Sequence, residues 1–271
     1  MKARTGPGLF VALALAVSSA CDITRPPDLH PDVVALGVLL FASESEAHLL
    51  AIHPHRGRED AAPDITATLE GPGWTAAFAH AADLAACTLA EEWLGPSKCL
   101  RTALPEAIRP DGAYRLHGTA PLGAFTGEMR MPTPPLLLEP GDTVRVEIPD
   151  DGKLIEIPLR YGPGPDVGTL LLEAMDFFET QEDGTEERLA WDAIWPVGGA
   201  GSDTARSLYL GKPLRFSLRL LGVGWHYTDF VEQGGKSLMT RPWPESGIEG
   251  EGVYGYFDGV TPSRAARIFA R

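Results

Sequence analysis

The sequence predicts a mainly β protein built of two sandwich-like parts. Short apolar or alternating segments follow one another at close spacing, and turn signals separate them. The chain also contains 24 prolines and 30 glycines, which favour many turns over long helices. The Pro-rich stretch MPTPPLLLEPGD marks a boundary near residue 140. We therefore expect an N-terminal domain over 32–139 and a C-terminal, β-rich domain over 140–271.

The first part should open with a buried strand. The segment DVVALGVLLFA (32–42) is rich in Val and Leu and is too short for a core helix with caps. Further strands are expected at AHLLAIH (47–53), DITATLE (64–70), GWTAAFAH (73–80), GAYRLHGTA (112–120) and AFTGEMRM (124–131). In the segment 112–120, Tyr114 and Leu116 should share one face. ADLAACTLAEEWLG (82–95) predicts a helix, with an ordered loop as the alternative.

The second part shows the clearest alternation of the chain. Leu214, Phe216, Leu218 and Leu220 should face inward from LRFSLRL (214–220). Two hairpins are expected, one joining 142–149 to 153–160 across DDG and one joining 168–180 to 186–194 across QEDG. A short helix within 224–235 should end at Gly234. The strands 250–259 and 263–270 should close the second sheet.

Residues 1–20 have the features of an export signal. Lys2 and Arg4 precede a short apolar run, and small residues follow it at 18–20. A membrane-spanning helix needs roughly 20 apolar residues, which this run does not reach. The leader is therefore expected to be removed. The full sequence has a formal charge of −14, and loss of Lys2 and Arg4 makes the remaining chain two units more negative.

The small residues directly before Cys21 resemble the lipobox of bacterial lipoproteins. That resemblance implies acylation of Cys21 and a tether over 21–31, where the sequence is polar and rich in proline. Ser18 stands where an aliphatic residue is usual, so ordinary secretory cleavage remains the alternative. The expected partner is a membrane, reached through Cys21.

Cysteine counting supports the lipid anchor. The chain has three cysteines, and lipidation of Cys21 would leave Cys87 and Cys99 as a pair. A disulfide between them would suit an oxidising compartment, while two separate buried thiols are the alternative. The acidic charge opposes binding to nucleic acid.

Three clusters could hold metal or perform catalysis, and each has a simpler interpretation. His53, His55, Glu59 and Asp60 could chelate a metal, but Pro54 favours a strand end beside a solvated loop. An acidic stretch from Glu173 to Glu187 could bind calcium, but it lacks the spacing of a calcium loop, and a solvated hairpin explains it. We predict no metal and no cofactor.

Glu249, Glu251 and Asp258 could form a carboxylate pair for glycoside hydrolysis. Such residues also occur on sheet surfaces without any catalytic role, and the sequence has no GxSxG, HExxH or CxxC motif. We predict no catalytic residue. Trp243, between two prolines, is the best exposed candidate for ligand contact. Tyr254 and Tyr256 are further candidates, divided between core and surface.

Several segments, in order, resemble a family of bacterial envelope lipoproteins catalogued as a domain of unknown function, the "four-two-four-nine" family. They are VVALGVL (33–39), AYRLHG (113–118), GEMRMP (127–132), LRFSLRL (214–220), the aromatic residues Trp225 and Tyr227, and GIEGEGVYGYF (247–257). The sequence departs from the family at Gly247, where Asn is usual, and in the insertion between the two later cysteines.

The resemblance implies an immunoglobulin- or transthyretin-like N-terminal sandwich and a companion role beside an outer-membrane uptake system. The sequence as a whole therefore predicts an exported, lipid-anchored, noncatalytic binding or accessory protein of the bacterial envelope, at the outer membrane. Its expected protein partner is a transporter or another envelope protein. A glycan-binding module and an envelope hydrolase using surface carboxylates are the alternatives.

Overall fold

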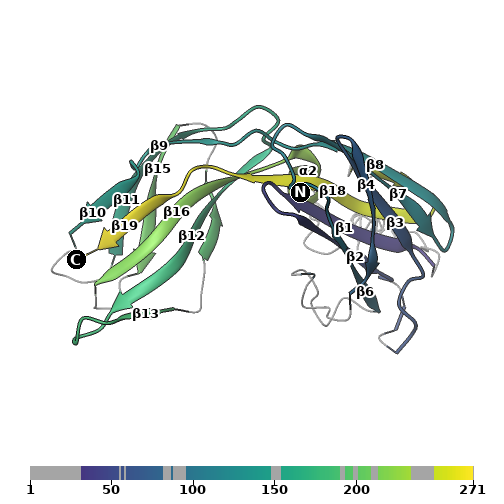
Figure 1. Ribbon diagram of the computed structural model, residues 1–271, viewed down its shortest axis with the longest axis horizontal. Coiled ribbons are helices and arrows are strands. Elements are labelled where there is room, and N and C mark those ends of the chain that lie inside the picture. Colours follow the sequence, from purple (N-terminus) through teal and green to yellow (C-terminus); the bar gives the residue numbers. More distant parts are fainter. Residues whose placement is uncertain are drawn as a thin grey trace, which may run out of the picture. The chain divides into compact units, whose positions relative to one another are not determined.

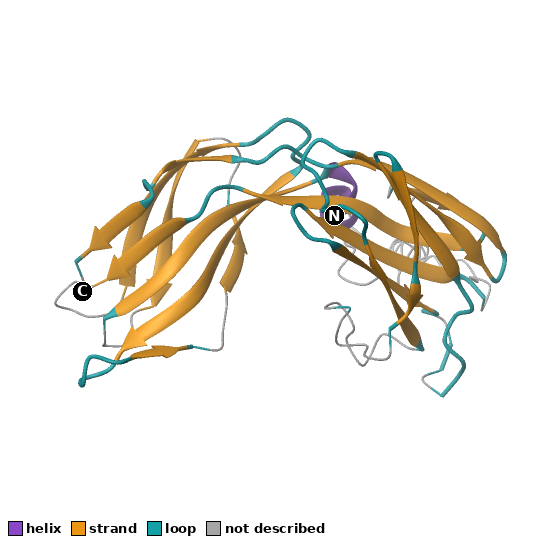
Figure 2. Ribbon diagram, viewed as in Figure 1, coloured by secondary structure: helices purple, strands orange, loops and turns teal. Residues whose placement is uncertain are grey.

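In a computed structural model, the strands of the described residues form three sheets, and the regular structure of these residues is almost entirely β (Figure 2). The structure describes residues 32–54, 56–57, 59–81, 87, 96–147, 154–189, 193–197, 201–208, 213–232 and 247–270. Residues 31–271 form one compact unit. The predicted mainly β, sandwich-like class is confirmed.

The largest sheet has eleven strands and runs through both halves of the chain. Its main path is β10 (Thr143–Val146), β19 (Ala266–Ala270), β16 (Leu214–Val223), β18 (Val253–Pro262), β1 (Val34–Phe41), β2 (Glu46–Ile52), β6 (Ser97–Ala103) and β5 (Ala79–His80). A branch pairs with β16 and consists of β12 (Thr169–Thr180), β13 (Glu186–Arg188) and β14 (Ala193–Pro196). We call it the long sheet.

Two smaller sheets cover the two ends of the long sheet. The five-stranded sheet has the order β17 (Ile248–Gly250), β8 (Gly123–Arg130), β7 (Ala113–Ala120), β3 (Thr66–Gly71) and β4 (Trp74–Ala77). The three-stranded sheet has the order β15 (Gly201–Leu208), β11 (Leu154–Gly162) and β9 (Leu136–Glu139). Each encloses its own apolar core against the long sheet.

Alternation along the strands fills both cores. Leu36 and Leu40 of β1 pack with Tyr114 and Leu116 of β7 in the first core, so the predicted inward face of β7 is confirmed. The second core contains the alternating inward residues predicted for β16, which are Leu214, Phe216, Leu218 and Leu220. Burial of such side chains contributes roughly 1.5–3 kcal/mol each.

The C-terminal strands return to the N-terminal sandwich. β18 pairs in parallel with β1, from Val34 opposite Val253 to Phe41 opposite Val260, and the two lie side by side in Figure 1. β17 pairs with β8. The predicted division at residue 140 had placed both returning strands in the second half. The pairing differs because the apolar faces of 248–260 complete the first core, where Ile248 and Phe257 are buried.

One predicted hairpin is wrong. Over their described residues the segments 142–149 and 153–160 do not pair, because β10 joins β19 in parallel and β11 joins β15 and β9 in another sheet. The alternation located both strands correctly, but their apolar faces meet across the second core instead of lying in one sheet. The DDG turn lies outside the described residues.

The second predicted hairpin is confirmed, with Phe178 of β12 opposite Arg188 of β13. Asp176 has a φ of +54° where β12 shifts register against β16, and the shift lets Phe177 enter the core out of phase with Ala174. The predicted C-terminal helix is α2 (Trp225–Glu232). Gly234 lies outside the described residues. So does the helix predicted over 82–95, of which only Cys87 is described.

Candidate binding groove

Two neighbouring strands of the long sheet are apolar on both faces. Leu36 and Phe257 point into the first core, while Ala35 of β1 and Tyr254 of β18, opposite each other in register, pack in a separate cluster. Because side chains alternate along a strand, this second cluster lies on the face turned away from the core. We call it the outer face of the long sheet.

Tyrosine rings cover part of the outer face. A Cβ on Gly37 would lie 2.9 Å from the Tyr256 hydroxyl oxygen, so glycine leaves room for that ring across β1. Tyr227 of α2 packs edge-on against Tyr256, with ring centroids 5.0 Å apart. Tyr254 and Tyr256 are each 2 % exposed, and burial raises the pKa of both hydroxyls. Both side chains are therefore buried in the apolar cluster of the outer face, and the ligand contact considered for them stays a prediction.

A buried carboxylate fixes α2 to the outer face. Asp258 is 2 % exposed, and its Oδ2 accepts a 2.7 Å hydrogen bond from the backbone N–H of Tyr227, one of the amides that a helix start leaves unpaired. Oδ1 accepts from the N–H of Gly259, also at 2.7 Å. A Cβ on Gly224 would lie 1.9 Å from Oδ1, so only glycine fits beside this cap. Burial raises the pKa of the Asp258 carboxyl, against the opposing effects of these amides and His226.

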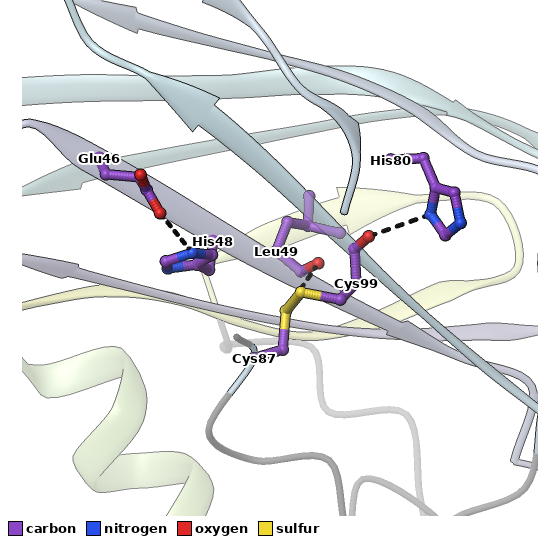
Figure 3. The surroundings of a disulfide bond; sticks show 6 residues. All are labelled: Glu46, His48, Leu49, His80, Cys87 and Cys99. Carbon is purple, nitrogen blue, oxygen red and sulfur yellow. Dashed lines mark hydrogen bonds and ion pairs between the residues drawn. A yellow bond between two sulfur atoms is a disulfide. The ribbon is translucent and has the colours of Figure 1, made fainter. Parts of the chain in front are cut away.

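A disulfide joins Cys87 to Cys99 of β6 on the same face (Figure 3). The predicted pairing is thus present, and both half-cystines are buried. Cys87 Sγ lies 3.5 Å from the carbonyl oxygen of Leu49. Because a disulfide sulfur carries no hydrogen, this is a packing contact. The bond attaches residue 87 to the outer face of the long sheet.

Beside this covered region the outer face forms a groove of about 680 Å³. Its apolar lining includes Leu39, Phe41, Leu171, Ile194, Leu221, Val223, Tyr227 and Val260. Phe41 is 44 % exposed and Ile194 is 56 % exposed, although both are large apolar residues. A concave, mostly apolar site of this size is typical of ligand-binding pockets.

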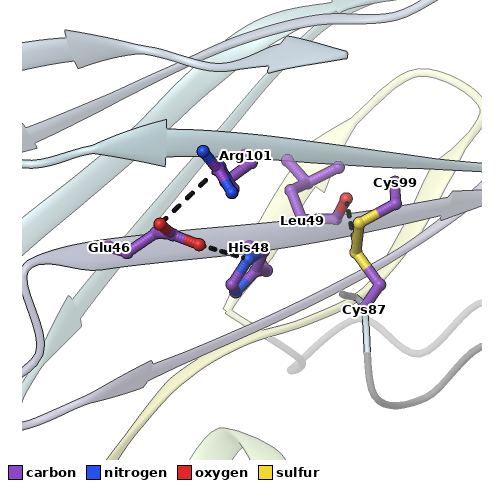
Figure 4. A network of polar contacts seen from close by, with 6 residues as sticks. All are labelled: Glu46, His48, Leu49, Cys87, Cys99 and Arg101. Atoms are coloured by element: carbon purple, nitrogen blue, oxygen red, sulfur yellow. Dashed lines mark hydrogen bonds and ion pairs between the residues drawn. A yellow bond between two sulfur atoms is a disulfide. The ribbon is translucent and has the colours of Figure 1, made fainter. Parts of the chain in front are cut away.

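The start of β2 supplies polar groups to the groove (Figure 4). His48 Nε2 lies 2.7 Å from Glu46 Oε1, outside hydrogen-bond geometry, so the contact is electrostatic when the imidazole is protonated. Arg101 Nε lies 3.6 Å from the other oxygen of Glu46. Glu44, in the turn before β2, also lines the groove and is exposed.

The histidine predicted at a strand end is buried. His53 is 2 % exposed, and its Nδ1 lies 3.2 Å from the carbonyl oxygen of Val33. Burial lowers its pKa below the ordinary value of 6.5. His55 lies outside the described residues. Among the residues that the structure describes, no three His, Cys, Asp or Glu side chains gather as a metal site.

The three carboxylates considered for hydrolysis lie in different surroundings. Glu249 is exposed on β17 of the five-stranded sheet and Glu251 in the turn after it, whereas Asp258 is buried on the long sheet. The acidic stretch 173–187 forms ion pairs instead, with Glu173 bound to Arg219 and Asp176 to Arg188. Cys21 and Trp243 lie outside the described residues.

Sequence reasoning missed the groove, although one signal pointed to it. β1 carries apolar residues at nearly every position, and β18 does so from Val253 to Phe257 apart from Gly255, which is typical of strands covered on both faces. Such strands require something on the second face. The sequence could not show which residues of β12, β14 and β16 would supply the rest of the lining.

No family model matches the chain, and no curated protein does. Among solved structures, tandem immunoglobulin repeats of Dlar align over 89 % of this chain and 98 % of theirs, at 11 % identity and a TM-score of 0.28. The N-terminal immunoglobulin module of the Drosophila receptor protein tyrosine phosphatase DLAR aligns over 89 % of this chain and 100 % of its own, at 11 % identity and a TM-score of 0.27. The Yersinia pseudotuberculosis adhesin InvE aligns over 85 % of this chain and 58 % of its own, at 8 % identity and a TM-score of 0.21. No described helix is long and apolar enough to cross a membrane.

Proposed function

We propose that this chain is an exported, lipid-anchored, noncatalytic binding or accessory protein of the bacterial envelope. The observation that carries the binding role is the groove on the outer face of the long sheet. Its lining is mostly apolar, yet Phe41 and Ile194 remain open to solvent. An exposed concave apolar surface on a rigid sheet suits recognition of a ligand or partner.

The anchor rests on the sequence around Cys21 and on the resemblance to envelope lipoproteins. The Cys87–Cys99 disulfide is consistent with an oxidising compartment. The same resemblance supports a place at the outer membrane and an uptake system as partner. The noncatalytic role is supported by the different surroundings of Glu249, which is exposed, and Asp258, which is buried and accepts a hydrogen bond from the Tyr227 amide.

The anchor is tested first by mass spectrometry of the N-terminal peptide isolated from native membranes. We expect an acylated Cys21 as the first residue, and a Cys21→Ala chain should leave the membrane fraction. An unmodified N-terminus with the protein in the soluble fraction would support ordinary secretion instead.

The accessory role is tested by gentle detergent pull-down of the tagged chain from native membranes. We expect stoichiometric recovery of one envelope protein, reduced by Ile194→Ser within the groove. Leu138→Ser is the matched control, because Leu138 is similarly exposed on β9 and does not line the groove. Recovery of the lipidated chain alone would count against a protein partner and direct attention to soluble ligands.

A further inference from the structure

The groove is apolar along most of its length and acidic where the β1–β2 turn meets it. Leu171, Ile194, Leu221, Val223 and Val260 come from β12, β14, β16 and β18. Glu44, Ser45, Glu46 and His48 come from the turn and from β2. A ligand that fills the groove therefore meets hydrocarbon along its body and carboxylates at one end.

Apart from the imidazole of His48, the ionisable groups of the lining at this end are carboxylates. The lining contains two glutamates and, among the described residues, neither lysine nor arginine. Arg101 and His48 contact the Glu46 carboxylate, whereas no described side chain pairs with that of Glu44. The chain as a whole carries a formal charge of −14. An anionic group would be repelled here, and a cation would find an available carboxylate.

We propose, on the basis of the binding role above, that the groove binds a small amphipathic cation. Its apolar body lies against Leu221 and Val223, and its ammonium or guanidinium group pairs with Glu44. Apolar contact provides the affinity, and the carboxylate selects the sign of the head group. The volume of about 680 Å³ accommodates a drug-sized molecule.

The experiment compares three probes that share a ten-carbon chain and differ in head group. They are decyltrimethylammonium, decyl maltoside and decyl sulfate, each kept below its micelle concentration. The full chain carrying Cys21→Ala is titrated without other detergent, and binding is followed by calorimetry. We expect the cation to bind at least about tenfold more tightly than the anion, with the neutral probe between them.

Two variants test which residues contact the head group and which contact the apolar body of the ligand. Glu44→Gln should weaken the cation about threefold relative to the neutral probe, as expected for an exposed ion pair. Glu251→Gln is its control, being exposed and outside the groove lining. Ile194→Ser should weaken all three probes, and Leu138→Ser should weaken none.

Equal affinity for cation and anion, or an unchanged ratio in Glu44→Gln, would overturn the proposed head-group selection. Absence of binding by all three probes would overturn the small-molecule site itself. Neither result bears on the accessory role, because the pull-down with Ile194→Ser measures that role separately. If a partner is recovered, Ile194→Ser reduces its recovery and none of the three probes binds, the groove binds a protein and not a small amphipathic cation.

Discussion

The outer face of the long sheet has two chemistries along one continuous set of strands. From the pairing of Glu173 with Arg219 onward, the face formed by β12 and β16 is polar, and the Arg215 guanidinium lies 4.2 Å from the centre of the Phe178 ring while pairing with Glu186. Along β1 and β18 the same face carries a second apolar cluster beneath a disulfide and α2. Alternation thus identifies which residues face a core, while the residues between them decide whether the other face is solvated or covered.

This contrast predicts that removing the disulfide has the largest effect. Replacing Cys87 and Cys99 by alanine should lower the free energy of unfolding by about 3 kcal/mol, because the bond links residues 12 apart in the sequence and so restricts the unfolded chain. Urea unfolding of the double variant measures it, with Cys21→Ala as a control for loss of a cysteine elsewhere. A change below about 1 kcal/mol would mean that the disulfide contributes little to the stability of the folded chain.

The cap on α2 should contribute next. Asp258→Ala should lower the free energy of unfolding by about 2 kcal/mol, since the Tyr227 amide loses its buried acceptor. Gly224→Ala should also destabilise the chain, because the new Cβ meets Asp258 Oδ1. The double variant should lose less than the sum of the two, since the first change removes the clashing carboxylate. Strict additivity of the two losses would contradict this packing.

A smaller effect should depend on pH. Burial lowers the pKa of His53 in the folded chain, so the unfolded chain binds the proton more readily. The stability it contributes is present above its ordinary value of 6.5 and is lost as the pH falls through the folded value. Urea unfolding between pH 7.5 and 5.5 should show this loss, and His53→Gln should lose less over the same interval. An equal slope in both chains would assign the pH dependence to other groups.

The polar region should be the least sensitive. Arg219→Gln should lower the free energy of unfolding by less than about 1 kcal/mol, because the guanidinium is partly exposed and its ion pair with Glu173 competes with water. Added salt should reduce the difference between the two chains further. A loss comparable to that of Asp258→Ala would show that the two regions are more alike than their chemistry indicates.

The sequence was a good guide to strands and a poor guide to their partners. The alternation in 214–220 and 113–120 identified core faces correctly, because burial on one face leaves a local pattern. The parallel pairing of β1 with β18 leaves no such pattern, since the partners lie far apart in the chain. The groove was missed for the same reason: its lining comes from six segments that only the sheet order brings together.

The pairing of β1 with β18 also affects the order in which the chain can fold. Val34 pairs with Val253, so β1 cannot complete its pairing until β18 has been made. The first strand of the chain is therefore among the last to be fully paired. At about 5–20 residues per second of synthesis, that interval lasts on the order of ten seconds or longer. During it β1 has an open, strongly apolar edge, which is the kind of segment that aggregates or recruits a chaperone. Any truncation before β18 would make that state permanent.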